Sequence, residues 1–257
     1  MEYTYKFDAE LVAKECIEWI KEWFEYCGPN CNAVIGISGG KDSTVAAALC
    51  VEALGKDRVY GILMPNGYQS DIEDAKKVVK TLGIHSFECN IKATYDAALE
   101  GAGWAVMAFG GTISEQTEIN LAPRIRMATL YAISQSINGR VVCTDNLSES
   151  FIGYSTRWGD NVGDFSPLAN LTSAEVVAVG DALGLPFELT HKTPTDGLCG
   201  KTDEDNFGFT YNQLNNVIIF ETCGDEEVDN KILNLCRKNF FKRVELPSYL
   251  PSSKVYK

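Results

Sequence analysis

The sequence is poor in histidine and in basic side chains, and it has no long apolar run. Only two histidines occur, His85 and His191, which argues against a histidine-rich zinc site and against a Ser-His-Asp hydrolase. No uninterrupted stretch of about 18 apolar residues is present, so no membrane span is expected. Lys and Arg number 23 against 35 Asp and Glu, which gives a net charge of −12. This balance disfavours a nucleic-acid partner and favours a small anionic substrate held by local arginines.

Cysteine is present, but the patterns of a disulfide scaffold or a redox centre are missing. Nine cysteines are scattered along 257 residues, and no C-x-x-C pair occurs. Residues 1–6 also lack the basic and apolar pattern of a secretory signal. Together these features predict reduced, mostly buried thiols in a cytoplasmic protein.

A glycine-rich loop carries the clearest chemical signal. Residues 38–43 read Ser-Gly-Gly-Lys-Asp-Ser and stand between a buried strand at about 32–37 and a helix at about 43–54. Such a loop directs backbone N–H groups and the positive end of the helix at one point, which favours a phosphate. Asp42 would repel a bare phosphate, so its presence indicates a Mg²⁺ ion that the phosphates share. Asp42 also stands where a P-loop needs Ser or Thr, which excludes that motif.

Strands and helices alternate along the first two thirds of the chain. An amphipathic helix at 8–26 precedes the first strand. Further strands are expected at 58–63, 84–89 and 140–144, and helices at 71–82, in a long stretch that contains Pro123, and from Thr172, where a capping box begins. The last third reads as helices at about 203–221 and 226–241. This βαβαβ order predicts an α/β fold, a Rossmann-like three-layer αβα sandwich with a doubly wound, mainly parallel sheet.

Polar residues follow the predicted strands at their carboxyl ends, which is where ligands bind in such sheets. Asp42 follows the first strand and Glu149 follows the fourth. If these two strands are neighbours, both carboxylates can share one hard cation with phosphate oxygens. Glu149 can equally be a solvated glutamate at the start of a helix.

Four segments resemble motifs of known enzymes. The loop pattern S-G-G-x-D-S resembles the PP-loop of ATP pyrophosphatases, which cleave ATP between its α and β phosphates. Three later segments resemble NAD synthetases: Asn120–Met127 with Tyr131 is similar to N-x-x-x-R-x-R-M-x-x-x-Y, Thr144–Asp160 to T-x-x-x-x-E…G-x-x-T-[KR]-x-G-D, and Pro194–Asp205 to P-[ST]-x-x-L…[TS]-D-E. Because the matches run in the right order from about residue 33 to 243, the chain is identified as a member of the ammonia-dependent NAD synthetase family.

The resemblance implies a reaction and a domain organisation. Deamido-NAD, ATP and ammonia would give NAD, AMP and pyrophosphate through an adenylated intermediate, with Mg²⁺ as the metal, in a homodimer that binds neither nucleic acid nor membrane. A single domain over 1–257 is expected, with an N-terminal helix at 8–26, an α/β core at about 32–185 and a C-terminal helical region at about 200–245. No room remains for a glutaminase domain, so free ammonia is the expected nitrogen source.

The resemblance also implies roles for individual residues. The catalytic residues would be Asp42 and Glu149, which hold the metal, and Asp160, which receives a proton from ammonium. The residues expected to bind ATP are Gly36, Ile37, Ser38, Gly39, Gly40, Lys41, Asp42, Ser43, Gln69, Thr144, Ser173 and Thr195. The residues expected to bind deamido-NAD are Arg124, Arg157, Asp164 and Lys242.

Several positions depart from the family pattern. Ser173 stands where the family often has a lysine, and Lys192 or Lys201 could supply the missing charge. A His-Lys pair of the family is Phe241-Lys242 here, so only the lysine is carried over. Lys41 is expected to be the least essential member of the loop, because related loops vary at that position.

Two alternatives remain beside these assignments. Arg124 and Arg126 could form surface salt bridges with Glu115 or Glu118 instead of binding a nucleotide. The whole chain could also be a tRNA-modifying PP-loop enzyme or a nucleotide sensor. The former should have a basic surface and a pair of reactive cysteines, and the latter could dispense with Asp42 and Glu149, so neither fits the sequence well.

Overall fold

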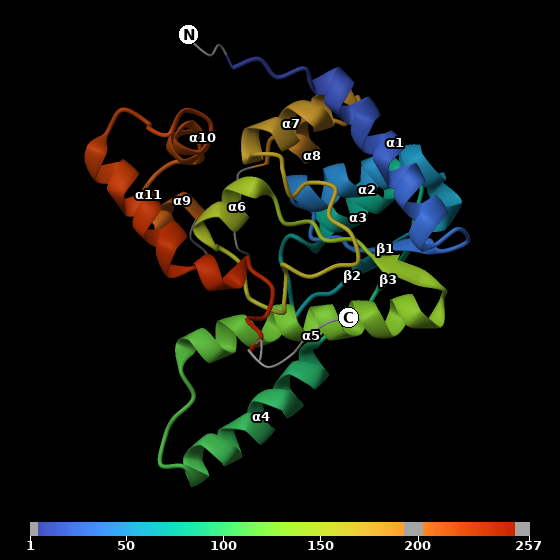
Figure 1. Ribbon diagram of the computed structural model, residues 1–257. Helices are drawn as coiled ribbons and strands as arrows, with labels where there is room; N and C mark the ends of the chain where they lie inside the picture. The colour runs from blue at the N-terminus through green and yellow to red at the C-terminus, as the bar shows by residue number, and fades with distance from the viewer. Residues whose placement is uncertain (1–4, 193–202, 250–257) are drawn as a thin grey trace, which may run out of the picture.

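A four-stranded parallel sheet forms the centre of the fold (Figure 1). The computed structural model describes residues 5–192 and 203–249. The strands are β1 (Asn32–Gly36), β2 (Val59–Leu63), β3 (His85–Glu88) and β4 (Gly139–Val141). The helices are α1 (Ala9–Cys27), α2 (Lys41–Leu54), η1 (Lys56–Arg58), α3 (Ile72–Leu82), α4 (Lys92–Ala108), α5 (Glu115–Ser136), α6 (Leu147–Ile152), α7 (Ser173–Ala182), α8 (Phe187–Thr190), α9 (Asp203–Phe207), α10 (Tyr211–Phe220), α11 (Glu226–Lys238) and η2 (Phe240–Lys242).

The strand order is β3-β2-β1-β4, so β1 pairs with both β2 and β4. Ala33 lies opposite Val59 on one side and Arg140 on the other, and both ladders are parallel. The condition under which Asp42 and Glu149 can lie close together, that the first and fourth strands are neighbours, is therefore met. The chain leaves β1 and β4 in opposite directions across the sheet, which creates the switch point where ligands bind in doubly wound folds.

Helices cover both faces of the sheet, because successive residues of β1 point to opposite sides. Ala33 and Ile35 pack into one core with α1, α2 and α7, whereas Val34 packs into a second core with Ile62 and Ala122 of α5. Figure 1 shows α4 and α5 on the opposite side of the sheet from α1 and α2. The predicted Rossmann-like three-layer αβα sandwich is confirmed.

The C-terminal helices form a third apolar cluster beside α6. Phe207, Tyr211, Leu214 and Ile232 are buried in it together with Ile152 of α6. This cluster places α9 to α11 against the segment that follows β4, at the carboxyl edge of the sheet (Figure 1).

The main differences from the sequence prediction concern three elements. The helix expected at about 203–221 is two helices, because Gly208 has a φ of +70° and Thr210 starts α10 with a capping box. The long stretch around Pro123 is also two helices, which are separated at Gly110, where φ is +75°. The fourth strand ends at Val141, three residues early; beyond it the Val142 N–H donates to the Val34 carbonyl oxygen at 2.9 Å, and Val142 forms an isolated bridge to Phe165.

Two expectations about composition can be compared with the described residues. The eight cysteines in these residues are all free thiols. Within the same ranges, no helix is both long enough and apolar enough to cross a bilayer.

Candidate active site

The glycine-rich loop closes on itself between β1 and α2. Ser38 Oγ lies 3.2 Å from Ser43 Oγ and accepts a hydrogen bond from the Gly40 N–H, also at 3.2 Å. The Gly40 N-cap offers no side chain to the first N–H groups of α2, which leaves them for an anion. Gly39, with a φ of +82°, packs so closely on Asp74 and Ala75 of α3 that no side chain fits. This geometry is compatible with the predicted binding of an anion by the loop, which stays a prediction.

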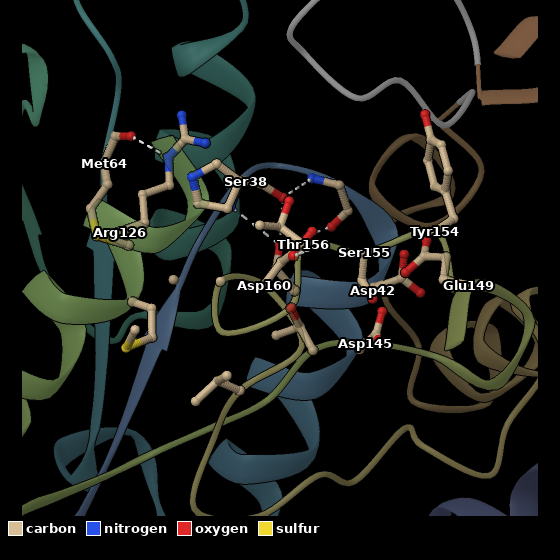
Figure 2. Close-up of a pocket in the computed structure, with 18 of the residues that line it drawn as sticks. Ser38, Asp42, Met64, Arg126, Asp145, Glu149, Tyr154, Ser155, Thr156 and Asp160 are labelled. Atoms are coloured by element: carbon tan, nitrogen blue, oxygen red, sulfur yellow. Dashed lines mark hydrogen bonds between the residues drawn. The ribbon is translucent and has the colours of Figure 1, made fainter. Parts of the chain in front are cut away.

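A cavity of about 800 Å³ opens in front of this loop. The loop forms one wall, α5 forms another, and residues 153–160 form a third. Figure 2 shows Ser38, Asp42, Asp145, Glu149 and Asp160 around this space. The volume suits a nucleotide-sized ligand.

Four carboxylates gather near the start of α2. Asp42 Oδ1 accepts a hydrogen bond from Asn146 Nδ2 at 3.0 Å, and Asp42 Oδ2 lies 2.7 Å from Lys41 Nζ. Glu149 Oε1 accepts from the Tyr211 hydroxyl at 3.5 Å, and that hydroxyl also donates to Asp203 Oδ2 at 3.0 Å. Asp145 is the fourth carboxylate, and it interacts with Glu149 directly.

Crowding of these carboxylates perturbs their titration. Removal from solvent, followed by repulsion from Asp42, raises the pKa of Glu149 well above its usual range. Removal from solvent and the charge of Asp160 likewise raise the pKa of Asp145. Burial lowers the pKa of Lys41, but Asp42 and Glu149 outweigh it and raise the pKa above the ordinary value. A cation bound among these carboxylates would therefore stabilise their ionised forms.

Asp42 and Glu149 could hold a hard cation such as Mg²⁺. In residues 5–192 and 203–249, no group of three or more His, Cys, Asp or Glu side chains is arranged to hold a metal by itself. Mg²⁺ does not need such a cage, since it takes one or two carboxylates and completes its shell with water and substrate phosphates. Figure 2 shows the side chains of Asp42 and Glu149 turned toward the same part of the cavity. The alternative of a solvated Glu149 is not supported, because its carboxylate lines the cavity beside Tyr211.

Asp160 occupies a different wall of the cavity. Its Oδ1 accepts a hydrogen bond from the Thr156 N–H at 2.5 Å. Packing around the carboxylate raises the pKa of Asp160, while Lys242 and Arg126 act in the opposite direction. Lys242 Nζ donates to the carbonyl oxygens of Gly153 and Ser155 at 2.8 and 2.9 Å, which fixes the segment that carries Asp160.

Most of the predicted ATP-site residues line the cavity. They are Gly36, Ile37, Ser38, Gly40, Lys41, Asp42, Ser43, Gln69 and Thr144, and the cavity is also lined by Glu149, Asp160 and Lys242. Gly39 does not line the cavity and packs against α3 instead. The Ser173 N–H donates to Ser148 Oγ at 2.9 Å, and Ser173 does not line the cavity. Thr195 lies outside the described residues.

Lys192 is one of the two lysines that could supply the positive charge missing at Ser173. It lines the cavity, but its Nζ pairs with Asp74 Oδ2 at 2.6 Å and with Asp71 Oδ2 at 3.5 Å. Lys201, the other candidate, lies outside the described residues.

Three of the residues expected to bind deamido-NAD do not line the cavity. Arg124 is exposed, and its Nε donates to the Arg157 carbonyl oxygen at 3.3 Å. The Arg157 guanidinium lies against the rings of Trp158 and Phe241. Asp164 accepts from the Val141 N–H at 2.7 Å and ties β4 to the following loop. Their role in nucleotide binding stays a prediction.

Arg126 lines the cavity but was not among the residues expected in the site. Its Nε donates to the Met64 carbonyl oxygen at 3.0 Å, and it lines the cavity (Figure 2). The helical period could have identified it, because Pro123, Met127 and Leu130 lie on the same face of α5 and also line the cavity. Arg124 lies two positions away and therefore faces elsewhere. In the described part of the chain, neither arginine pairs with Glu115 or Glu118.

Comparison with known proteins identifies the family. The sequence model of the NAD synthase family matches residues 12–246. An NH(3)-dependent NAD(+) synthetase of Pyrococcus furiosus is 36% identical over 83% of this chain and 79% of its own length. Two solved structures cover 96% of this chain and 100% of their own: an NMN synthetase from Francisella tularensis, with a TM-score of 0.84 and 29% identity, and an NH3-dependent NAD synthetase from Campylobacter jejuni, with a TM-score of 0.77 and 27% identity. With its phosphate loop and carboxylates placed around one cavity, the chain belongs to the NAD synthase family.

Proposed function

We propose that this chain is an ammonia-dependent NAD synthetase, which amidates deamido-NAD at the expense of ATP. The observation that carries the proposal is that the glycine-rich loop with Asp42, and Glu149 after β4, line one nucleotide-sized cavity. Membership of the NAD synthase family and the curated relatives named NH(3)-dependent NAD(+) synthetase support the same reaction.

The order of the chemical steps follows from the reactivity of a carboxylate. Ammonia cannot displace oxygen from the nicotinate carboxylate until that oxygen becomes a good leaving group. The carboxylate oxygen therefore attacks the α-phosphorus of ATP, the bond to pyrophosphate breaks, and Ser38 and Ser43 hold the departing pyrophosphate. Ammonia then attacks the acyl carbon, and the bond to AMP breaks. When bound at Asp42 and Glu149, Mg²⁺ would supply neutralisation of the charge that accumulates as two anions meet.

Asp160 is the residue proposed to accept a proton from ammonium. Its carboxylate lies at the cavity wall, and the hydrogen bond that Asp160 Oδ1 accepts from the Thr156 N–H fixes its orientation. Asp160→Asn should leave the first-turnover burst of pyrophosphate release intact and lower steady-state NAD formation about 100-fold. Raising the pH, which supplies more free ammonia, should recover part of the lost rate. Full NAD formation by the variant with ammonium at neutral pH would contradict this role.

One assay tests the proposed function as a whole. Purified protein receives ATP, Mg²⁺ and deamido-NAD with either ammonium or glutamine, and AMP, pyrophosphate and NAD are followed. AMP and NAD are expected with ammonium, and only background formation is expected with glutamine. Absence of AMP under every condition would refute the enzyme assignment, and equal rates with glutamine would refute the nitrogen source.

A mononucleotide substrate is the second candidate. The solved structure with a TM-score of 0.84 is that of an NMN synthetase, which makes the amide of a mononucleotide a reasonable product. The same assay with nicotinate mononucleotide in place of deamido-NAD separates the two candidates. A higher kcat/KM for the dinucleotide is the expected result.

A homodimer is also proposed, with α4 and α5 at its interface. Trp104, Met107 and Phe109 are 62%, 58% and 89% exposed on and beside α4, and α4 projects from the body of the protein (Figure 1). A surface with several large exposed apolar side chains is typical of a protein contact. Sedimentation analysis should give the mass of a dimer, and a monomer at micromolar concentration would contradict this interface.

The cytoplasmic location, the single-domain organisation and the absence of a glutaminase domain stay predictions. Free thiols in the described residues support a reducing compartment.

A further inference from the structure

Lys41 is buried, although it belongs to a loop that is expected to meet solvent and ligand. Its side chain is 5% exposed, and its Nζ lies 2.7 Å from Asp42 Oδ2. The ammonium also lies 5.6 Å from the centre of the Tyr211 ring. A lysine is almost never this buried unless negative charge stabilises it.

The position of Lys41 in its helix is unfavourable on its own. Lys41 is the first residue of α2, where the helix dipole is positive and a cation is repelled. Only a local concentration of negative charge can hold an ammonium there. Asp42, Glu149 and Asp203 supply that charge. The burial of Lys41 is therefore explained by the carboxylate cluster and not by helix formation.

The two oxygens of Asp42 are both engaged in the described structure. Oδ1 accepts from Asn146 Nδ2 at 3.0 Å, and Oδ2 accepts from Lys41 Nζ. The ammonium thus lies among the same carboxylates that could hold Mg²⁺. A divalent ion that binds Asp42 has to displace this hydrogen bond and to overcome repulsion from the ammonium.

A bound triphosphate changes this balance. Its phosphates would enter at the loop 38–43, where Lys41 itself is rooted, and would offer the ammonium a new anionic partner. Asp42 Oδ2 would then be released for the metal. The ammonium of Lys41 would stay in the site when the triphosphate binds, and a phosphate would replace Asp42 as its partner.

We propose that Lys41 is the resident counter-ion of the Asp42–Glu149 pair in the nucleotide-free enzyme, and that it makes metal binding dependent on ATP. Lys41 is a positioning residue in this account, because it acts through the metal ligands. The inference rests on the proposed function only for the placement of the metal at Asp42 and Glu149. It replaces the expectation that Lys41 is the least essential member of the loop.

The first test needs only the wild-type protein. Binding of Mn²⁺, a paramagnetic substitute for Mg²⁺, is measured by electron paramagnetic resonance with and without a non-hydrolysable ATP analogue, and without deamido-NAD. Mn²⁺ is expected to bind at least about tenfold more tightly when the analogue is present, after correction for Mn²⁺ bound to free analogue. Equal affinities would overturn the proposal.

The second test removes the charge of Lys41. Lys41→Met keeps the length of the side chain and should bind Mn²⁺ about tenfold more tightly than the wild type in the absence of nucleotide. Lys41→Arg keeps the charge and should retain the weak affinity. Lys77→Met is the matched control, because it removes a lysine that pairs with Glu188 on the surface. An unchanged affinity of Lys41→Met, or an equal gain in Lys77→Met, would overturn the proposal.

A thermal measurement gives an independent readout. Without metal, Lys41→Met should melt at a lower temperature than the wild type, because its carboxylates lack a counter-ion. Addition of Mg²⁺ alone should then raise its Tm more than it raises the Tm of the wild type, whereas equal increases would overturn the proposal. None of these measurements uses turnover. An enzyme that does not amidate deamido-NAD would refute the proposed function, and the role of Lys41 as counter-ion would still be tested separately.

Discussion

Asp42→Asn is expected to lower the rate of adenylate formation by about 100-fold to 1,000-fold. Asn has the shape of Asp and can still accept the hydrogen bond from Asn146 Nδ2, so the fold should be retained. The loss of one negative charge removes a metal ligand from the cavity and leaves the triphosphate poorly neutralised. The rate is measured as pyrophosphate release at saturating ATP and Mg²⁺.

The matched control for this variant is Asp57→Asn. Asp57 is an exposed residue of η1, so the same chemical change is made away from the cavity. The control should keep the wild-type rate, and circular dichroism should show that both variants are folded. An Asp42→Asn enzyme that releases pyrophosphate at the wild-type rate would show that Asp42 is not a metal ligand.

Gly39→Ala should destabilise the protein by about 2–5 kcal/mol, which is the sum of backbone strain and overpacking. Gly39 has a φ of +82°, and a Cβ there would lie 2.7 Å from the Ala75 nitrogen and 2.8 Å from Asp74 Cβ. The backbone of α3 cannot yield without moving the loop. Urea denaturation gives the free energy of unfolding, and calorimetry should show weaker binding of ATP.

Gly83→Ala separates the two contributions to this effect. Gly83 also has a positive φ, +64°, but its Cβ would meet only the Lys56 side chain at 3.8 Å. A cost of about 1–2 kcal/mol is expected for this control, because the backbone conformation is the only penalty. If Gly39→Ala were no less stable than Gly83→Ala, the close packing of the loop on α3 would not contribute.

The fold class and the glycine-rich loop could be predicted because both depend on local patterns. A buried strand followed by Ser38–Ser43 and a helix is recognisable from neighbouring residues alone. The sequence left open whether the first and fourth strands are neighbours, and the structure pairs them, so that Glu149 follows a strand beside β1. Asp42 and Glu149 accordingly meet at one cavity.

The parts that could not be predicted depend on contacts between distant segments. The burial of Lys41 could not be predicted, because Glu149 on α6 and Asp203 on α9, which join Asp42 around its ammonium, come more than 100 residues later. Arg124 and Arg126 lie on different faces of α5, so Arg124 bonds to Arg157 and Arg126 bonds to Met64. After the fourth strand, the backbone of Cys143 bonds to Phe165, a residue that lies 22 positions later in the sequence. In each case the deciding partner is remote in the sequence.

The contact between Gly153 and Asn239 limits the side chains that position 153 can accept. Gly153 has a φ of +67°, and a Cβ at that position would lie 2.3 Å from Asn239 Cβ, while Asn239 Nδ2 donates to the Ile152 carbonyl oxygen at 2.8 Å. Lys242 bonds to the same stretch through the Gly153 carbonyl oxygen. A side chain at position 153 therefore has to displace Asn239 and with it the turn after α11. The wall of the cavity formed by residues 153–160 thus depends on the exact position of a turn about 80 residues later in the chain.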